Sequence, residues 1–529
     1  MGPISARWSV LITSILAGTI LLFAGLGAHA LWDDEAMDAL NAKAILKSGD
    51  TVSMIDQNLV AYRDGLLLVK GRQQGMPPLP GYLASVGIYA FGNSALAARI
   101  LFALCGVITI TMIMVFAFRL GLQPFQLALV SFVMLTNVSF LLYFRNCHYY
   151  GPGIMLTTAS LILYYREIET SKGQLLLGLA SGFLLLSNYT WFIALYACLV
   201  IDLLIWRRYL LKGSFSVFLR IFTPPFLAGL LILWRWNPLG TKLGGYLHQN
   251  SLHQRMKLFF WNWRDLNVCE FISLGVVLLA FFLAISSKEN IIRRLLVSLI
   301  IYIITITILS TQLLSETSLA DVRYMAGCLP ICIAITSYAV IVLVQKNIIL
   351  GLVFALIACG TNIFNGGPFW EVGVRSLISQ YVVEIFSPVE DPYTPASQWI
   401  SRTLKPGATI MVLPDYMTYP LMYHAPNATY AWQLTPEQQS NAQFKDLPPI
   451  HFQGKEFPEY IMVFGPLVSQ VDATLSNWNR HGIHYMRIAT INTFWKDLYR
   501  PEIFWRVFKP LKEYDLNSQA VYIYKRQNI

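Results

Sequence analysis

Three adjacent carboxylates, Asp33, Asp34 and Glu35, follow directly after the first long apolar run of the chain. One interpretation is a solvated helix start, because acids are favourable in the first turn of a helix and residues 35–46 have helix-forming composition. The other is functional, since three carboxylates beside a bilayer are costly unless a cation, a metal or a reaction uses them. A carboxylate in this place could act as general base toward a hydroxyl group.

Basic residues that could hold a phosphate group occur in two later segments. Arg323 follows a short polar stretch and opens a further apolar run. Arg255 and Lys257 lie in a longer polar segment, 237–267, together with His253. Arginine suits phosphate because its guanidinium contacts two oxygens at once. The alternatives are that Arg323 snorkels to the lipid headgroups and that His253 is an ordinary surface residue.

The composition places these residues in a membrane protein. Of 529 residues, 55% are hydrophobic and only 13% are charged, whereas soluble proteins carry about 25% charged residues. The net charge is +10, and the surplus lies before residue 366, because the remainder carries as many acidic as basic side chains. Lys and Arg in a membrane domain set topology and meet lipid phosphates. We therefore expect membrane lipids as partners, and no nucleic acid.

Eleven apolar runs are candidates for spanning helices, which need about 20 mostly apolar residues. They cover residues 8–28, 94–118, 122–143, 149–165, 174–189, 190–206, 217–236, 271–286, 292–312, 324–344 and 347–364. The two short runs beside Asn188 could instead form a re-entrant pair. The first run also resembles a signal peptide ending in Ala28-His29-Ala30, but its length of about 20 residues favours a retained anchor.

The charges of the short loops predict the orientation. Alternate loops, beginning with the N-terminus, are rich in Lys and Arg, so the positive-inside rule places the N-terminus in the cytoplasm. An odd number of spans then places the C-terminal tail outside the inner (cytoplasmic) membrane. The two long outer loops are residues 30–93 and 237–267, and loops of this length usually carry function.

The tail differs in character from the rest of the chain. After residue 364 the sequence is polar and rich in Pro and Tyr. Its short alternating runs, which are typical of strands, are 409–413, 460–464 and 521–524. We expect an α-helical polytopic domain over residues 1–364 and a small α/β domain over residues 365–529 on the outer face.

Short motifs in order along the chain resemble those of the GT-C glycosyltransferases. They are Asp34-Glu35 after the first span, Pro77-Pro78-Leu79 before the second, Phe91-Gly92-Asn93 with Arg99, Arg145 with Tyr149, and Arg323-Tyr324 with Pro330. Tyr499-Arg500-Pro501-Glu502 in the tail is also similar to a segment of bacterial members. The lipid A aminoarabinose transferases and the protein O-mannosyltransferases are the nearest groups.

The resemblance implies an inverting transfer of a sugar from a polyprenyl-phosphate donor to a lipid, glycan or protein acceptor outside the cytoplasm. Asp34 would take the acceptor proton, with Glu35 and Asp33 beside it. The leaving phosphate needs fixed positive charge. The candidates for that charge are Arg323, Arg255, Lys257 and Arg145.

The chain departs from the aminoarabinose transferases directly before Pro77. Gly75 and Met76 stand where those enzymes have Glu-Lys, so a lysine and an acid that helps to bind metal in some members are missing. The donor sugar therefore stays open. A divalent metal also stays open, with His253 as its candidate ligand.

Two other functions compete with a sugar transferase. A transporter or flippase for a lipid-linked glycan predicts charged residues at mid-span positions and inverted repeats. A scaffold subunit predicts that the acidic loop and Arg323 tolerate substitution. The acids of this chain cluster in outer loops and no repeat is visible, which favours the enzyme.

Overall fold

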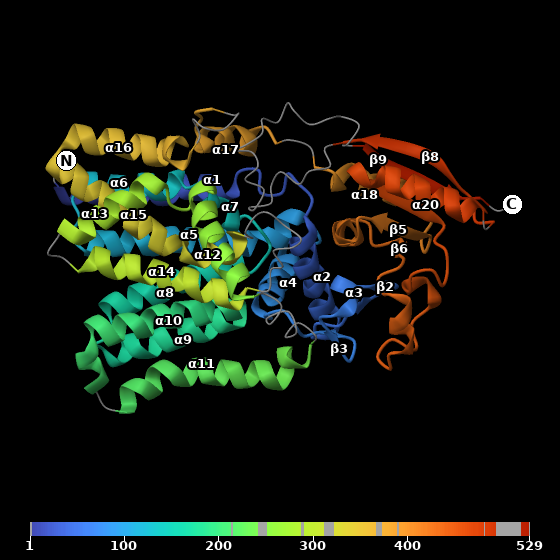
Figure 1. Ribbon diagram of the computed structural model, residues 1–529, viewed down its shortest axis with the longest axis horizontal. Helices are drawn as coiled ribbons and strands as arrows, with labels where there is room; N and C mark the ends of the chain where they lie inside the picture. The colour runs from blue at the N-terminus through green and yellow to red at the C-terminus, as the bar shows by residue number, and fades with distance from the viewer. Residues whose placement is uncertain are drawn as a thin grey trace.

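The computed structural model combines a bundle of apolar helices with a mixed β-sheet at one end of it (Figure 1). It describes residues 3–212, 215–241, 251–286, 290–310, 322–366, 373–388, 391–480, 482–493 and 520–527. The tail motif that begins at Tyr499 lies outside the described residues. A layer formed by residues 30–93 lies between the bundle and the sheet.

Every predicted span corresponds to a helix or to two consecutive helices. These are α1 (Pro3–Phe23), α5 (Ala95–Arg119), α6 (Pro124–Thr136) with α7 (Val138–Phe144), α8 (Tyr150–Arg166), α9 (Ser171–Ser187), α10 (Tyr189–Trp206), α11 (Phe215–Arg235), α13 (Leu274–Ser286), α14 (Ile291–Leu309), the 3-10 helix η4 (Val322–Cys328) with α15 (Leu329–Lys346), and α16 (Ile348–Gly360). The α-helical polytopic fold predicted from the sequence is confirmed.

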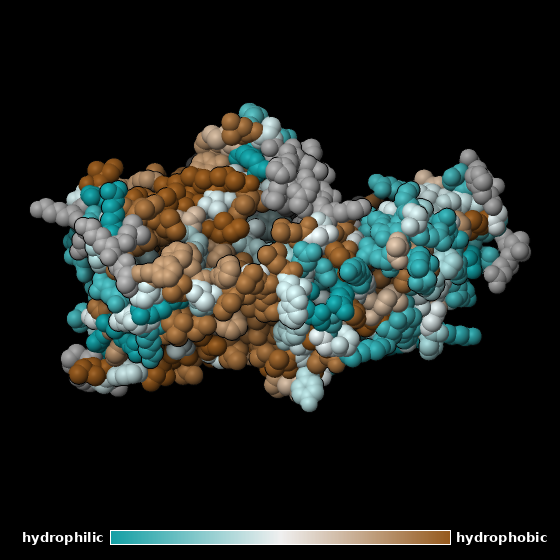
Figure 2. Space-filling view, turned by 90° about the horizontal axis from the view of Figure 1, so that it is seen from below, coloured by the Kyte–Doolittle hydropathy of each residue, from teal (hydrophilic) through white to brown (hydrophobic). Residues whose placement is uncertain are grey.

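The described helices differ in how well each could cross a bilayer alone. Six are long and apolar enough by themselves: α1, α5, α10, α11, α14, and η4 continued by α15. Four others, α8, α9, α13 and α16, have 17, 17, 13 and 13 residues. Hydrophobic residues gather over the bundle, and hydrophilic residues cover its two ends (Figure 2). The chain is thus a multi-pass membrane protein.

Two asparagines break apolar runs into separate helices. The run predicted as one span at 122–143 bends by 65° between α6 and α7. Asn137 lies at the bend, and its side-chain oxygen accepts a hydrogen bond from the backbone N–H of Phe140 at 2.9 Å. Asn188 caps α10 in the same way, accepting from the N–H of Trp191 at 2.9 Å. A side chain that satisfies the first free N–H groups of a helix favours a new helix start.

The first predicted outer loop is largely folded. It contains the largely buried helix α2 (Asp33–Ser48) and the partly exposed helix α4 (Leu79–Phe91), which pack against each other. Between them lie the hairpins β1–β2 (Met54–Ile55 and Asn58–Leu59) and β3–β4 (Leu68–Val69 and Arg72–Gln73), and the short helix α3 (Tyr62–Gly65). The second predicted outer loop contains α12 (Leu252–Val268).

The tail forms the predicted α/β structure. Its sheet has the order β6-β5-β7-β9-β8. The strands are β5 (Thr409–Leu413), β6 (Thr429–Tyr430), β7 (Tyr460–Phe464), β8 (Tyr485–Asn492) and β9 (Ala520–Arg526), and the helices are α17 (Leu377–Phe386), α18 (Tyr393–Thr403), α19 (Thr418–His424) and α20 (Val468–Arg480). Strands β5, β6 and β7 are parallel, whereas β9 runs antiparallel to β7 and β8. All five residues of the central strand β7 are buried.

The sheet domain is anchored on the loop layer by Asn58. Its side-chain amide donates to the carbonyl oxygen of Ala428 at 2.9 Å and its oxygen accepts from the N–H of Tyr430 at 2.9 Å. Helix α19 also packs against α2. Residues 30–93 and the tail therefore lie at the same end of the bundle (Figure 1).

Candidate active site

The acidic triplet forms the first turn of α2, and the structure buries all three side chains. Asp33, Asp34 and Glu35 are 6%, 6% and 0% exposed. The interpretation as a solvated helix start is therefore wrong. A buried carboxylate is costly unless it is paired and hydrogen-bonded, so the partners of each acid indicate what it does.

Glu35 ties three segments together. Arg99 of α5 donates to both of its oxygens, from Nε at 2.8 Å and from Nη2 at 2.6 Å. The backbone N–H of Cys147 donates to it at 2.7 Å and that of Trp32 at 3.3 Å. Arg99 also donates to the carbonyl oxygens of Leu26, His29 and Ala30. These contacts give Glu35 and Arg99 a positioning role that holds the start of α2 in place.

Asp34 has a different partner. Its Oδ2 accepts a hydrogen bond from Nη1 of Arg323 in η4, a residue 289 positions later. The Asp34 side chain is 9% exposed and that of Arg323 is 15% exposed, so the pair is largely shielded. The structure thus brings together the two residues that the sequence had singled out as base and phosphate ligand.

A cavity of about 210 Å³ opens beside this pair. Its lining residues are Asp34, Met37, Tyr62, Leu67, Met76, Pro77, His148, Tyr149, Asn188, Tyr189, Thr190, Ile306, Leu309, Ser310, Arg323 and Tyr324. They come from the loop layer and from the adjoining ends of α8, α10, α14 and η4. Met76 and Pro77, at the point where the chain departs from the aminoarabinose transferases, belong to its wall.

Two further ionisable residues, Asp38 and His148, were missed from the sequence. Asp38 lies four residues after Asp34 on α2, and its Oδ2 is 2.5 Å from Nδ1 of His148. Both are buried. The only sequence signal was the four-residue spacing, which places two side chains on one face of a helix.

Their pKa values reflect this environment. Burial lowers the pKa of His148, but the charge of Asp38 and the hydrogen bond to it prevail, so the pKa is raised above 6.5. Burial raises the pKa of Asp38, and His148 opposes that shift.

Asp33 and Arg145 lie outside the cavity lining. Asp33 faces the tail, where burial first and the charge of Asp33 second raise the pKa of Tyr419 in α19. Arg145 donates from Nη1 to the carbonyl oxygens of Leu21, Leu22 and Ala24 at 3.2, 2.8 and 2.7 Å. Arg145 therefore caps the C-terminal end of α1, where a cation is favourable.

Arg255, Lys257 and His253 lie on α12, also outside the cavity lining. Arg255 donates to the carbonyl oxygens of Thr307 and Ile308 at the end of α14, at 3.1 and 2.5 Å. The ammonium of Lys257 lies 4.7 Å from the ring centre of Trp261. Among the described residues, no group of three or more His, Cys, Asp or Glu side chains is arranged to hold a metal ion, and His253 belongs to no such group.

The chain is similar to proteins that share one membrane fold. A family model described as dolichyl-phosphate-mannose-protein mannosyltransferase matches residues 75–232. The crystal structure of ArnT from Cupriavidus metallidurans bound to undecaprenyl phosphate is 13% identical, and the match covers 97% of each chain with a TM-score of 0.58. Its apo state gives a TM-score of 0.56 at the same identity and coverage. No curated protein matches by sequence.

The protein has a GT-C fold. The predicted resemblance is confirmed at this level. An oligosaccharyltransferase from Archaeoglobus fulgidus is also similar, at 10% identity and a TM-score of 0.45, over 86% of this chain and 69% of that one. The family match begins after Asp34 and ends before Arg323, so it covers neither of these two residues.

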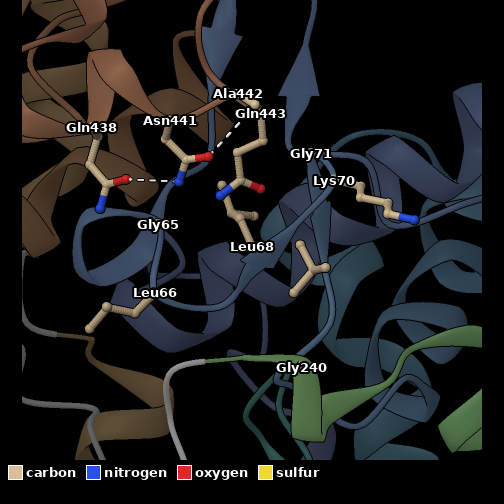
Figure 3. A pocket seen from close by; sticks show the side chains of 11 residues that line it. Gly65, Leu66, Leu68, Lys70, Gly71, Gly240, Gln438, Asn441, Ala442 and Gln443 are labelled. Carbon is tan, nitrogen blue, oxygen red and sulfur yellow. Dashed lines mark hydrogen bonds between the residues drawn. The ribbon is translucent and has the colours of Figure 1, made fainter.

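The protein has another, larger cavity of about 630 Å³ between the β3–β4 hairpin and the tail (Figure 3). Amide side chains of Gln438, Asn441 and Gln443 lie along one side of it, and Gln438 accepts from Asn441 at 3.3 Å. The described residues that line it include no carboxylate and no histidine. The smaller cavity is the candidate active site because Asp34, a possible general base, lies in its wall.

Proposed function

We propose that the protein is a membrane glycosyltransferase that moves a sugar from a polyprenyl-phosphate donor to an acceptor hydroxyl on the extracytoplasmic side, with inversion at the sugar carbon. The observation that carries the proposal is the shielded pair of Asp34 and Arg323 in the wall of a cavity. A carboxylate supplies the base, and a guanidinium supplies a phosphate ligand. The fold shared with ArnT bound to undecaprenyl phosphate supports a lipid-linked donor.

The pair suggests how the reaction is ordered. While Asp34 and Arg323 contact each other, neither is available for catalysis. A donor phosphate that enters the cavity competes for Arg323 through bidentate contact, and this releases the Asp34 carboxylate. The acceptor oxygen then attacks the sugar carbon from the face opposite the phosphate. Asp34 accepts the hydroxyl proton, and the carbon–oxygen bond to the phosphate breaks with its electron pair on the phosphate.

The side of the reaction follows from the predicted orientation. The cavity lies at the end of the bundle that carries residues 30–93 and the tail (Figure 1). The basic short loops assign the opposite end to the cytoplasm. We therefore place the reaction at the outer surface of the cytoplasmic membrane, with a lipid, glycan or protein hydroxyl as acceptor.

The test is a reaction with purified protein in lipid nanodiscs. A panel of labelled polyprenyl-phosphate sugars is incubated with envelope lipid and glycan fractions, and release of polyprenyl phosphate is measured together with the anomeric configuration of the product. The proposal expects release with one donor class and an inverted product, and loss of release in Asp34→Asn. Translocation of intact donor across a vesicle membrane, without release, would instead support the flippase function.

A further inference from the structure

Asp38 and His148 form a second charged pair directly beside Asp34. Asp38 lies one turn along α2 from Asp34, and His148 lies between α7 and α8. Their side chains are 4% and 3% exposed, with 2.5 Å between Asp38 Oδ2 and His148 Nδ1. A short contact between a carboxylate and a ring N–H is a strong, charge-assisted hydrogen bond.

The ring of His148 is held in one orientation. Its centre lies 4.2 Å from that of Tyr149 and 4.8 Å from that of Tyr150. His148 nevertheless belongs to the cavity lining, together with Asp34 and Arg323. Because Asp38 engages Nδ1, Nε2 is the ring nitrogen that remains for a molecule in the cavity. A carboxylate that hydrogen-bonds one ring nitrogen of a histidine fixes its tautomer, and this arrangement is common at functional sites.

The proposed reaction needs more positive charge than Arg323 alone brings to the cavity wall. Among the described residues that line it, Arg323 is the one Lys or Arg and Asp34 is the one carboxylate. The two offset each other. A polyprenyl-phosphate sugar carries one negative charge, and the phosphate that leaves gains a second. Positive charge placed where negative charge develops is a large source of rate enhancement. Once Asp34 has taken the acceptor proton, Arg323 alone offsets only one of the two negative charges on the leaving phosphate.

We propose that His148, held by Asp38, is the second cationic phosphate ligand and donates a hydrogen bond from Nε2 to the leaving polyprenyl phosphate. This inference rests on the proposed function. The imidazolium keeps its proton during the step. The carbon–oxygen bond breaks toward the phosphate, the acceptor proton goes to Asp34, and His148 and Arg323 share the two negative charges.

The surroundings of His148 favour the imidazolium form near neutral pH. Burial lowers the pKa of His148, and Arg323 lowers it further, but Asp38 and then Asp34 raise it, with a net rise above 6.5. Glu35, on the same turn of α2, acts on Asp38 and is itself paired with Arg99. The groups that face the ring are thus mainly acidic.

Equilibrium binding of radiolabelled undecaprenyl phosphate to the full-length protein in nanodiscs tests this role without knowledge of the sugar. We expect His148→Gln to weaken binding about tenfold near pH 6.5, which corresponds to about 1.4 kcal/mol. At higher pH the wild-type imidazolium loses its proton, so the two affinities should converge. The free phosphate titrates identically in both experiments, so the ratio of the two affinities at each pH reports the contribution of His148.

Asp38→Asn gives a second variant that keeps the volume and an acceptor oxygen. It removes the charge that favours the imidazolium, so binding should begin to weaken at a lower pH than in the wild type. His484→Gln, in the tail before β8, is the matched control and should bind as the wild type does. Size-exclusion profiles and thermal midpoints establish that each variant is folded.

The outcomes separate the two proposals. If the folded wild type does not bind undecaprenyl phosphate, the proposed function fails, and the role of His148 fails with it. If the wild type binds and folded His148→Gln binds equally well at every pH, the phosphate role of His148 is wrong and the proposed function stands. Equal binding together with loss of the acidic limb of the turnover profile would make His148 a base instead, which also overturns this inference.

Discussion

Asp34 and Arg323 are in direct contact although 289 positions separate them in the chain. The two opposite charges offset each other. A phosphate group that takes Arg323 frees the carboxylate at the same time. In the proposed reaction, this contact couples arrival of the donor to activation of the base.

Asp34→Asn should abolish turnover while the protein still folds. The amide cannot accept a proton, and a general base contributes on the order of a hundredfold to ten-thousandfold. The variant should bind undecaprenyl phosphate at least as tightly as the wild type, because the phosphate no longer competes with the Asp34 carboxylate for Arg323. Asp56→Asn, which changes an exposed acid of the same loop layer, is the control. Turnover near the wild-type rate in Asp34→Asn would assign the base elsewhere.

Arg323→Lys separates phosphate binding from interfacial anchoring. Lysine keeps the charge but loses the planar fork that contacts two oxygens. We expect normal folding and a fall in donor turnover of at least about tenfold, or roughly 1.4 kcal/mol of transition-state stabilisation. Arg402→Lys on α18, which is exposed, should change nothing. An unchanged rate in Arg323→Lys would leave this residue as an anchor at the headgroups.

Glu35→Gln should act on stability. The substitution leaves the Arg99 guanidinium buried without its carboxylate, and breaking a buried pair from one side costs about 3–5 kcal/mol. We expect a large drop in the thermal unfolding midpoint. The double variant Glu35→Gln/Arg99→Met should recover part of that drop, because no unpaired charge remains. A stable Glu35→Gln protein that has lost turnover would instead indicate that Glu35 is a catalytic residue.

Neutralising Arg255 and Lys257 together should weaken capture of undecaprenyl phosphate and leave the chemical step unchanged. Both lie on α12 outside the cavity lining, so their charges act on the donor at a distance. The effect should therefore disappear at high salt, since the Debye length falls from about 10 Å at 0.1 M to about 3 Å at 1 M. The exposed pair Arg402 and Lys405 gives the matched double variant. A single-turnover rate that falls in the α12 variant would contradict this view.

The environment of His424 predicts that the stability of the protein depends on pH. Its Nε2 accepts a hydrogen bond from the N–H of Leu31 at 3.0 Å. Burial, followed by the charges of Arg99 and Lys43, lowers its pKa to about 3. Between about pH 6.5 and pH 3 the unfolded chain binds the extra proton, so this residue makes stability fall as pH falls, by at most about 1.4 kcal/mol per unit.

The measurement compares thermal midpoints at about pH 7.5 and about pH 5.5. His424→Gln keeps an acceptor for Leu31 but does not titrate, so its midpoint should fall less than that of the wild type across this range. His484→Gln should fall as much as the wild type does. Equal slopes for all three proteins would show that His424 does not contribute.

The sequence by itself determined that the chain has a helical membrane fold and that the acidic triplet directly follows the first apolar run. An apolar run of spanning length can be recognised from the local sequence alone, because about 20 mostly apolar residues are what a bilayer requires, whatever the helix packs against. The strands at 409–413 and 460–464 were equally visible, since alternation along a strand is a local pattern. The bend at Asn137 was not, because one asparagine in an apolar run signals a break only when its side chain is seen to cap the next helix.

Tertiary structure alone decided which partner each of the three adjacent acids contacts. Asp33, Asp34 and Glu35 are adjacent and chemically alike, and no local pattern says which one meets Arg99, which meets Arg323 and which faces the tail. Helical geometry points adjacent side chains about 100° apart, so each enters a different environment. Asp38 and His148 show the same limit: their pairing joins α2 to the turn before α8, and only packing of the whole bundle brings those two segments together.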